Sequence, residues 1–226
     1  MTRDIIKTVI CFSLFFLPLF VFSETPEELL LQRKEQKIKT YIYQAKSGER
    51  DQKIDVLDKI LSEFDEMKYS EKDKKLVELI VYLSEEGSTR KEYENNRVIN
   101  DFPDVRRKAV KVLAKIKGDA ARDALINVLI NDEDSLVKAE ACLALAEVGD
   151  SSSGDALRAL VYVYRRTYKP DPNFVMAIIQ AVQKIAKSNY SSYGDAIYIL
   201  SEIQMGNYNR QIREAAYNAL QELGKK

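Results

Sequence analysis

The chain has 226 residues, and its 35 Lys and Arg residues are matched by 35 Asp and Glu residues. This balance gives no electrostatic reason to expect nucleic-acid binding, which needs a clear excess of Lys and Arg on one face. The sequence also has no His, so it lacks a common base for activating nucleophiles and a common ligand for zinc or iron. We therefore expect no catalytic residue, no cofactor and no metal site.

Residues 1–23 have the layout of a secretory signal peptide. Arg3 and Lys7 give a positive start, and residues 9–22 form an apolar run that is short for a stable membrane span. Cleavage at the end of this segment would place the rest of the chain in the periplasm of a bacterium with two membranes. The alternative is an uncleaved inner-membrane anchor over residues 5–22, with the rest facing the periplasm, and only then do we expect membrane contact.

The segment that follows, residues 24–48, predicts an N-terminal capping helix. Thr25 is suited to the N-cap, Pro26 to the first helical position, and Glu28 can close a capping box with Thr25. The helix should end at Gly48. Its expected apolar face consists of Leu31, Ile38, Ile42 and Ala45.

An apolar pattern then returns five times. Each copy has apolar residues at a first position and at 4, 8 and 11 residues after it, which places them on one face of a helix. The copies are Val56, Ile60, Phe64, Met67; Val105, Ala109, Leu113, Ile116; Val137, Ala141, Leu145, Val148; Phe174, Ile178, Val182, Ile185; and Ile212, Ala216, Leu220, Leu223. We expect helices to approach closely at the shared Ala109, Ala141 and Ala216 position.

A second apolar set follows each of the first four copies and predicts a second helix. The expected members are Leu76, Leu79, Ile80; Leu125, Val128, Leu129; Leu157, Leu160, Val161; and, shifted by three positions, Ile197 and Leu200. A single helix pair cannot bury its own apolar face, so these pairs must stack on one another.

The pairs fall into two blocks separated by a polar insertion. Residues 49–86 form a degenerate first repeat, and residues 102–226 hold the better repeats. Residues 87–101, between them, have no helical apolar pattern and exceed the usual length of a connection between helices. They are either a mobile insertion or a binding loop. No segment alternates apolar and polar residues over a sustained length, so we expect no sheet.

The start of each repeat carries a recognisable motif. Residues 101–109 (DFPDVRRKA), 134–141 (DSLVKAEA) and 209–216 (NRQIREAA) open first helices, all three with an apolar–basic pair at the first ladder position, and residues 145–150 (LAEVGD) lead into a second helix. This pattern resembles HEAT repeats of the short HEAT-like subclass. The first repeat lacks the Val-Arg pair, and Phe174-Val175 replaces it in the repeat that starts there.

The resemblance implies an all-α fold, a right-handed α-solenoid of about four to five antiparallel helix pairs in an armadillo-type superhelix. First helices would line its convex surface and second helices its concave surface. The motif residues determine the fold, so the family supplies no general catalytic residues to transfer.

Three short features have ordinary structural explanations that we prefer. The acidic run Asp132-Glu133-Asp134 is expected to cap a helix rather than bind a cation. Cys142, beside a ladder position, is expected to be a packed and inert thiol. Ser151-Ser152-Ser153 reads as a turn.

The stretch after Val161 interleaves aromatic and cationic residues, as interface hot spots do. The candidate partner-binding residues are Tyr162, Tyr164, Arg165, Arg166, Tyr168 and Lys169, together with Tyr198 in the next repeat. The alternative is that Tyr164 packs in the core and the arginines cap the carbonyls of a helix C-terminus. Tyr190, Tyr193 and Tyr208 extend the aromatic bias, and tyrosines lining the concave side would suit an extended peptide or a protein helix.

These observations favour an exported, non-enzymatic scaffold that binds another protein and supports the assembly or maintenance of a periplasmic or envelope complex. We expect no small-molecule substrate. One alternative is a HEAT-like enzyme or enzyme-assembly factor, similar to lyases that act on a bound protein or chromophore. Nucleic-acid binding is a further alternative, opposed by the predicted export and the balanced charge.

Overall fold

The structure is a computed structural model that describes residues 25–188 and 193–225. The predicted signal segment and Tyr190 lie outside the described residues. The chain divides into two units, Met1–Glu35 and Gln36–Lys226. Helix α2, Pro26–Ser47, crosses from the first unit into the second.

The described residues form ten helices and one short hairpin. The bounds after α2 are α3 Arg50–Ser62, α4 Lys74–Glu85, β1 Tyr93–Glu94, β2 Arg97–Val98, α5 Pro103–Ile116, α6 Gly118–Asn131, α7 Ser135–Val148, α8 Asp155–Arg166, α9 Pro172–Ser188, α10 Tyr193–Met205 and α11 Arg210–Gly224. None of the described helices is long and apolar enough to cross a membrane.

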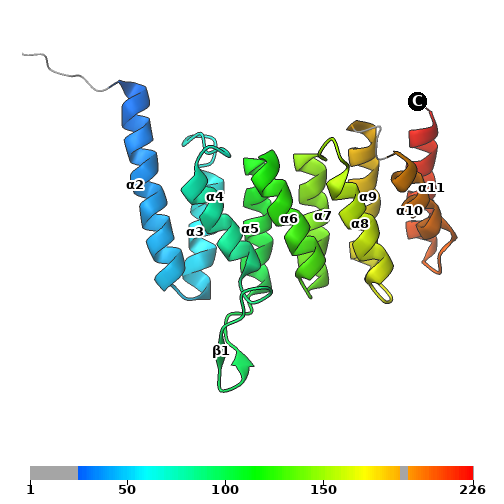
Figure 1. The fold of residues 1–226 in the computed structure, drawn as a ribbon, viewed down its shortest axis with the longest axis horizontal. Coiled ribbons are helices and arrows are strands. Elements are labelled where there is room, and N and C mark those ends of the chain that lie inside the picture. The colour runs from blue at the N-terminus through cyan, green and yellow to red at the C-terminus, as the bar shows by residue number, and fades with distance from the viewer. Residues whose placement is uncertain (1–24, 189–192, 226) are drawn as a thin grey trace, which may run out of the picture. The chain divides into compact units, whose positions relative to one another are not determined.

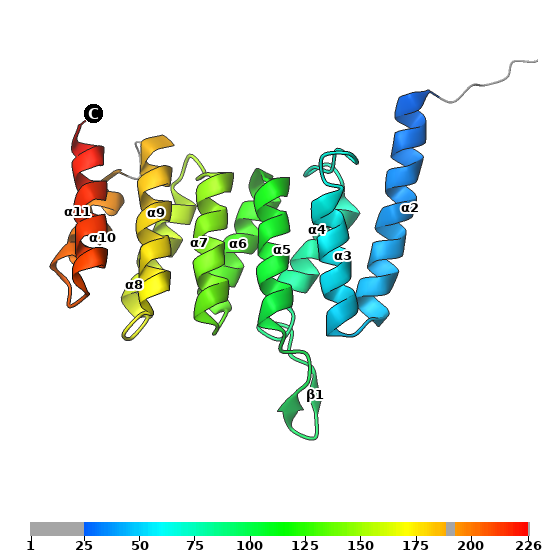
Figure 2. The same ribbon diagram turned by 180° about the vertical axis from the view of Figure 1, so that it is seen from behind.

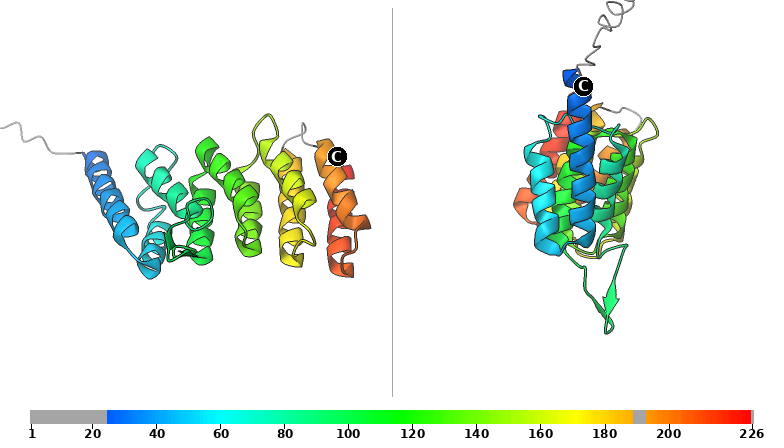
Figure 3. Two further views of the ribbon diagram at one scale, coloured as in Figure 1. Left: turned by 60° about the horizontal axis from the view of Figure 1, so that its bottom comes forward. Right: turned by 90° about the vertical axis from the view of Figure 1, so that its left-hand side faces the viewer.

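Within residues 36–226 the helices from α3 onward lie in two layers. The first helices, α3, α5, α7, α9 and α11, each contact the next member of their own layer, and so do the second helices, α4, α6, α8 and α10. Figure 1 shows the second-helix layer on the near side, Figure 2 shows the first-helix layer, and the end-on view in Figure 3 shows the two layers together. The prediction of an α-solenoid of stacked helix pairs is confirmed.

The apolar ladder predicts the core of this unit well. All five first-helix copies are buried at their predicted positions, except that Val148 and Leu220 are half-buried. The shared alanines, Ala109, Ala141 and Ala216, are fully buried where helices pack. Small side chains at these positions allow the close approach that was expected.

One second-helix assignment is wrong. Ile197 is exposed, and the buried face of α10 is made by Ala196, Ile199, Leu200 and Ile203. The buried face of α10 begins at Ala196, one residue before the expected Ile197, so it is rotated relative to the face that the ladder predicts. Ile197 therefore belongs to the surface.

The helix starts follow local capping chemistry. In the first unit the Thr25 backbone N–H donates to Glu28 Oε2 at 2.7 Å, and the Glu28 backbone N–H donates to Thr25 Oγ1 at 3.2 Å, which is the predicted capping box. At α7, Asp134 Oδ1 accepts the backbone N–H groups of Leu136 and Val137 at 2.8 and 3.0 Å. The capping interpretation of this acidic run is thus confirmed for Asp134.

Glu63 ties the C-terminal half of α2 to the end of α3. The Tyr41 and Tyr69 hydroxyl groups donate to Glu63 Oε1 at 2.5 and 2.9 Å, and Lys37 forms an ion pair with the same carboxylate. Burial raises the pKa of Glu63, but the hydrogen bonds from Lys37, Tyr41 and Tyr69 outweigh it and hold the pKa below its ordinary value.

Glu63→Gln should weaken the protein at neutral pH and flatten its response to acid. A carboxylate with a lowered folded pKa stabilises the fold above its unfolded pKa of about 4.5, and that stabilisation is lost as the pH falls through the folded value. We expect urea unfolding of the wild type to lose stability below about pH 4.5, with a shallower loss in the variant. An identical slope in both proteins would contradict this role.

The first-helix layer is crossed by polar contacts at every step. Lys108 pairs with Asp58, Lys111 lies 3.8 Å from Glu140, Lys184 lies 2.5 Å from Glu147, and Lys187 lies 2.6 Å from Glu222. Each pair joins a first helix to the next one. Exposed pairs contribute little to stability individually, and their effect here is a charged, mutually neutralised surface.

The insertion corrects the expectation of no sheet. Strands β1 and β2 pair antiparallel, with Tyr93 opposite Val98 and Glu94 opposite Arg97, and the hairpin projects beyond the ends of the helices (Figure 1). Asn95 and Asn96, in the two-residue turn, both have positive φ, as a type I′ turn requires. Two-residue strands are too short to show an alternating pattern, so the Asn-Asn turn was the available signal.

Candidate protein-binding site

The predicted binding residues lie on two neighbouring second helices. Tyr162, Arg165 and Arg166 are exposed on α8, and Tyr198 is exposed on α10, which contacts α8. On a helix, residues three and four positions apart share a face. The structure therefore brings these four side chains to one surface, which we call the α8–α10 surface and define by Tyr162, Arg165, Arg166, Ile197, Tyr198, Glu202 and Met205.

A cation–π contact joins the two helices. The Arg165 guanidinium carbon lies 4.3 Å from the centre of the Tyr198 ring, and Arg165 Nε lies 3.9 Å from Glu202 Oε2. The Tyr198 hydroxyl group donates to Glu202 on the same helix. These contacts order the three side chains while leaving them accessible, which reduces the entropy lost on binding.

The other cations lie over tyrosine rings. The Arg166 guanidinium carbon is 5.3 Å from the centre of the Tyr162 ring, and Lys169 Nζ is 5.4 Å from the centre of the Tyr168 ring. Tyr168 and Lys169 follow the end of α8, and Lys169 has a positive φ of 49°. The exposed rings are thus each accompanied by a positive charge.

Tyr164 does not belong to this surface. It is half-buried, and the Tyr208 hydroxyl group donates to the Tyr164 hydroxyl oxygen at 3.2 Å. Burial, then this hydrogen bond, raises the pKa of Tyr164. Tyr193 also makes an internal contact, donating its hydroxyl proton to the Leu223 carbonyl oxygen. The alternative explanation for Tyr164, internal packing, agrees with its position.

An apolar cleft on α10 was missed from the sequence. It has a volume of about 630 Å³ and is lined by Gly194, Ile197, Tyr198, Ser201, Glu202, Met205 and Gly206. Met205 is 86% exposed. Ile197, which the ladder placed in the core, lines this cleft, so the irregular spacing of the fourth repeat was the available signal.

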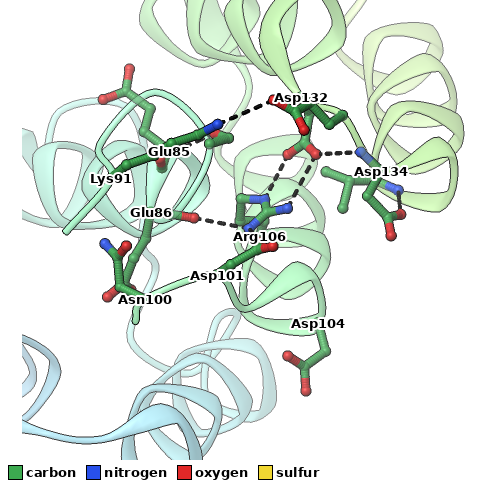
Figure 4. Close-up of polar contacts among 12 residues, drawn as sticks. Glu85, Glu86, Lys91, Asn100, Asp101, Asp104, Arg106, Asp132 and Asp134 are labelled. Carbon is green, nitrogen blue, oxygen red and sulfur yellow. Dashed lines mark hydrogen bonds and ion pairs between the residues drawn. The ribbon is translucent and has the colours of Figure 1, made fainter. Parts of the chain in front are cut away.

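A buried polar network holds the base of the hairpin (Figure 4). Arg106, the basic residue of the repeat motif, is 2% exposed, and its Nε and Nη2 groups donate to the two oxygens of Asp132 at 2.6 and 3.2 Å. Its Nη1 group donates to Asp101 Oδ1 at 2.7 Å and to the Glu86 carbonyl oxygen at 3.0 Å. One guanidinium therefore joins α5, the end of α6 and both ends of the insertion.

Burial and pairing act in opposite directions on Arg106. Burial lowers the pKa of the guanidinium, whereas the hydrogen bonds to Asp132 and Asp101 raise it, and the net direction is upward. Lys53 and Glu86 form a second buried ion pair beside it. The charges at this site are thus compensated inside the protein.

Asn100 closes the hairpin base. Its Oδ1 atom accepts the Glu92 backbone N–H at 2.9 Å, and its Nδ2 group donates to the Arg90 carbonyl oxygen at 2.8 Å. Asn100 is 4% exposed. These contacts fix residues 87–101 at the base of the hairpin, and a binding role for the insertion stays a prediction.

Asn100→Ala should loosen the hairpin, because the Glu92 backbone N–H loses its partner and the Arg90 carbonyl oxygen keeps only the Gly87 N–H as a donor. The expected cost is about 1 kcal/mol in the free energy of unfolding. Amide hydrogen exchange should be faster at the Glu92 backbone N–H, while helix α7 keeps its protection from exchange. Glu94→Ala, which removes an exposed side chain of β1, is the control, and equal exchange at Glu92 in both variants would contradict the role of Asn100.

The remaining candidates have structural roles. Cys142 is fully buried, and burial raises the pKa of its thiol, in line with a packed cysteine. Ser151 donates to Asp155 Oδ2 at 2.6 Å in the turn before α8. Within the described ranges, no cluster of three or more His, Cys, Asp or Glu side chains is placed to hold a metal ion.

Comparison with known proteins agrees with this architecture. Residues 97–166 match the family model described as HEAT repeats. A solved structure described as the complex of CpcE and CpcF of phycocyanin lyase from Nostoc sp. PCC7120 contains a similar chain, with a TM-score of 0.56 and 20% sequence identity. The match covers 84% of this chain and 65% of that one, so this chain spans less than two thirds of its neighbour. No curated protein matches the sequence. Residues 97–166 thus hold HEAT repeats within an α-solenoid.

Proposed function

We propose that this protein is a non-catalytic scaffold that holds a partner protein against the α8–α10 surface. The coarse function, a protein-interaction scaffold, is what HEAT repeats suggest. The finer proposal, a particular surface on two helices, rests on the residues exposed there.

The supporting observation is the difference between the two layers. The first-helix layer neutralises its charges across every step, as the four ion pairs above describe. On the second-helix layer, α8 and α10 instead expose Tyr162, Ile197, Tyr198 and Met205 around an apolar cleft. Clustered tyrosine, arginine and apolar side chains are typical of the central part of protein interfaces.

Photocrosslinking in intact cells tests this proposal. A photoreactive phenylalanine analogue would replace Tyr198, and the control would carry it at Lys184 on the first-helix layer. We expect a discrete adduct at 198 and none at 184, and mass spectrometry would identify the attached protein. Adducts of equal yield at both positions, or at 184 alone, would contradict the proposed surface.

The identified partner then allows a matched comparison of two tyrosines. Tyr162 on α8 and Tyr217 on α11 are each 46% exposed. We expect Tyr162→Ala to weaken binding of the purified partner by about 1–2 kcal/mol, roughly a tenfold change in Kd, and Tyr217→Ala to leave it unchanged. Equal effects would show that exposure of an aromatic ring, not its place on α8, sets the affinity.

Export to the periplasm, and a task in assembling or maintaining an envelope complex, are part of the same proposal. The apolar run and positive start of residues 1–23 support export. Residues 1–30 fused to alkaline phosphatase, which is active only outside the cytoplasm, should give enzyme activity, and Leu17→Arg in the apolar run should abolish it. An inactive wild-type fusion would place the scaffold in the cytoplasm.

A second candidate is a component of a lyase-like assembly that acts on a bound protein or chromophore. The observation that favours it is the shared fold with a chain in the phycocyanin lyase complex. In that case the purified protein should bind the chromophore of phycocyanin, detected as a shift of visible absorbance, and Met205→Asp in the α10 cleft should abolish the shift. An unchanged spectrum at micromolar protein would exclude this candidate.

A further inference from the structure

We infer that the partner contacts the α8–α10 surface through an acidic segment that carries an apolar anchor, an inference that rests on the proposed function. The surface combines uncompensated positive charge from the end of α8 with an apolar cleft on α10. A binding segment must satisfy both features at once.

The charge comes from three cations, Arg165, Arg166 and Lys169, and two anions, Glu202 and Asp195, both of which act on Arg165. Arg165 is shared between Tyr198 and Glu202, whereas Arg166 and Lys169 lie over the rings of Tyr162 and Tyr168. In the part of the chain that the structure describes, no ion pair joins Arg166 or Lys169 to a carboxylate. The whole chain has equal numbers of positive and negative residues, so this excess is local.

A cation stacked on a ring is held in position with its donors free. Arginine presents several N–H groups in one plane, which matches a carboxylate in a bidentate arrangement. Arg166 on Tyr162 is therefore oriented to receive Asp or Glu, and Lys169 adds a second positive charge near it. Complementary charge of this kind sets specificity and speeds association.

The apolar cleft specifies the second feature. Ile197, Tyr198 and Met205 line it, and because it is open to solvent, an apolar side chain of a partner can reach it. Because Met205 is flexible and polarisable, it can adapt to an aromatic or aliphatic anchor. An acidic helix or extended segment with apolar residues on one side meets both requirements.

The apolar cleft argues against a purely electrostatic occupant. Single-stranded nucleic acid also stacks on aromatic rings beside cations, and an anionic membrane also attracts cations. Neither supplies a matched apolar side chain to the Ile197 and Met205 cleft at the same time as carboxylates for Arg166. Binding of a nucleic acid or of an anionic membrane is therefore measured alongside peptide binding.

Binding of two designed peptides to the purified mature chain tests the inference. Both peptides are helical, share Leu residues on one face and are labelled with fluorescein, and one carries Glu where the other carries Lys. We expect the Glu peptide to bind at least about tenfold more tightly than the Lys peptide, and added salt to weaken it. Equal binding of the two peptides would overturn the inference.

Charge reversal locates the interaction. Arg166→Glu/Lys169→Glu should weaken binding of the Glu peptide by about tenfold or more. The control, Lys184→Glu/Lys187→Glu, changes the net charge by the same amount on the first-helix layer and should leave the Kd within about twofold, since the exposed pairs it removes contribute little. Circular dichroism would confirm that both variants are folded.

Two further probes separate the other occupants. One probe is a vesicle containing phosphatidylglycerol, and the other is a single-stranded oligonucleotide. Each should bind the wild type no more tightly than it binds the Lys184→Glu/Lys187→Glu control. Tight binding of either probe that is lost in Arg166→Glu/Lys169→Glu would overturn the inference in favour of that ligand.

The results also separate this inference from the proposed function. If the adduct at position 198 persists in Arg166→Glu/Lys169→Glu, and the Glu peptide fails to bind the wild type, the scaffold surface stands and the acidic partner segment is wrong. If no adduct forms at position 198, the proposed surface itself is wrong.

Discussion

Arg106→Met is expected to lower the free energy of unfolding by about 3–5 kcal/mol, because it leaves Asp132 buried without its counter-ion. The Asp132 side chain is inaccessible, and the Arg106 side chain is 3% exposed. Methionine keeps much of the volume of the arginine stem, so the change reports mainly on the lost charge and hydrogen bonds. Urea unfolding followed by circular dichroism measures it.

Two controls test whether the loss of the buried charge pair causes the expected destabilisation. Arg107→Met changes the next residue, whose side chain is 40% exposed and lies 3.8 Å from Glu140, and should cost less than about 1 kcal/mol. In the Arg106→Met/Asp132→Leu double variant, both charges are removed, so its cost should be smaller than the sum of the two single effects. Additive single effects would show that the pair is not coupled.

Leu145→Ala is expected to lower the free energy of unfolding by about 2–5 kcal/mol, because it opens a cavity where α7 packs against its neighbours. Leu145 is fully buried at the third ladder position, and α7 contacts α5, α6 and α9. In a stacked repeat array each unit is stabilised by the units beside it, so a central defect weakens both interfaces.

The matched control lies two residues earlier on the same helix. Leu143 is 38% exposed, and Leu143→Ala should cost less than about 1 kcal/mol. Thermal unfolding of the two variants, at equal protein concentration, would compare them. Equal losses would mean that burial at the ladder position does not control stability.

The fold could be predicted from the sequence because its signal is repeated. Val105, Ala109 and Leu113 define one face of a helix, and the same spacing returns from Val137. Each repeat solves the same packing problem, so the periodicity of one copy supports the others. Helix α11 departs from it: Tyr217 is exposed where the equivalent Val110 and Cys142 are buried.

The hairpin and the contacts of Arg106 and Asn100 at its base could not be predicted in the same way. Two-residue strands have no detectable period, and the partner of Arg106 is Asp132, 26 residues later. Nothing in the spacing of a single copy indicates that the two side chains meet inside the protein. Asn100 is equally ordinary in the sequence, and its role arises from the return of the chain to Arg90 and Glu92.

The sequence indicated part of the surface that we propose. The Tyr and Arg pattern after Val161 indicated Tyr162, Arg165 and Arg166, but it also included Tyr164, which packs against Tyr208. Ile197 was assigned to the core by extending the ladder into a repeat whose second helix is rotated. The surface on α8 and α10 depends on which side of α10 faces outward, and the spacing of the preceding repeats does not indicate that side.

Amide hydrogen exchange of the purified chain, with and without the partner identified by crosslinking, tests the central claim most directly. The account predicts slower exchange in the presence of the partner over residues 155–169 and 193–205, which contain α8 and α10, and unchanged exchange in α5 and α7. Slower exchange confined to the first helices α5, α7 and α9, with α8 and α10 unaffected, would contradict it.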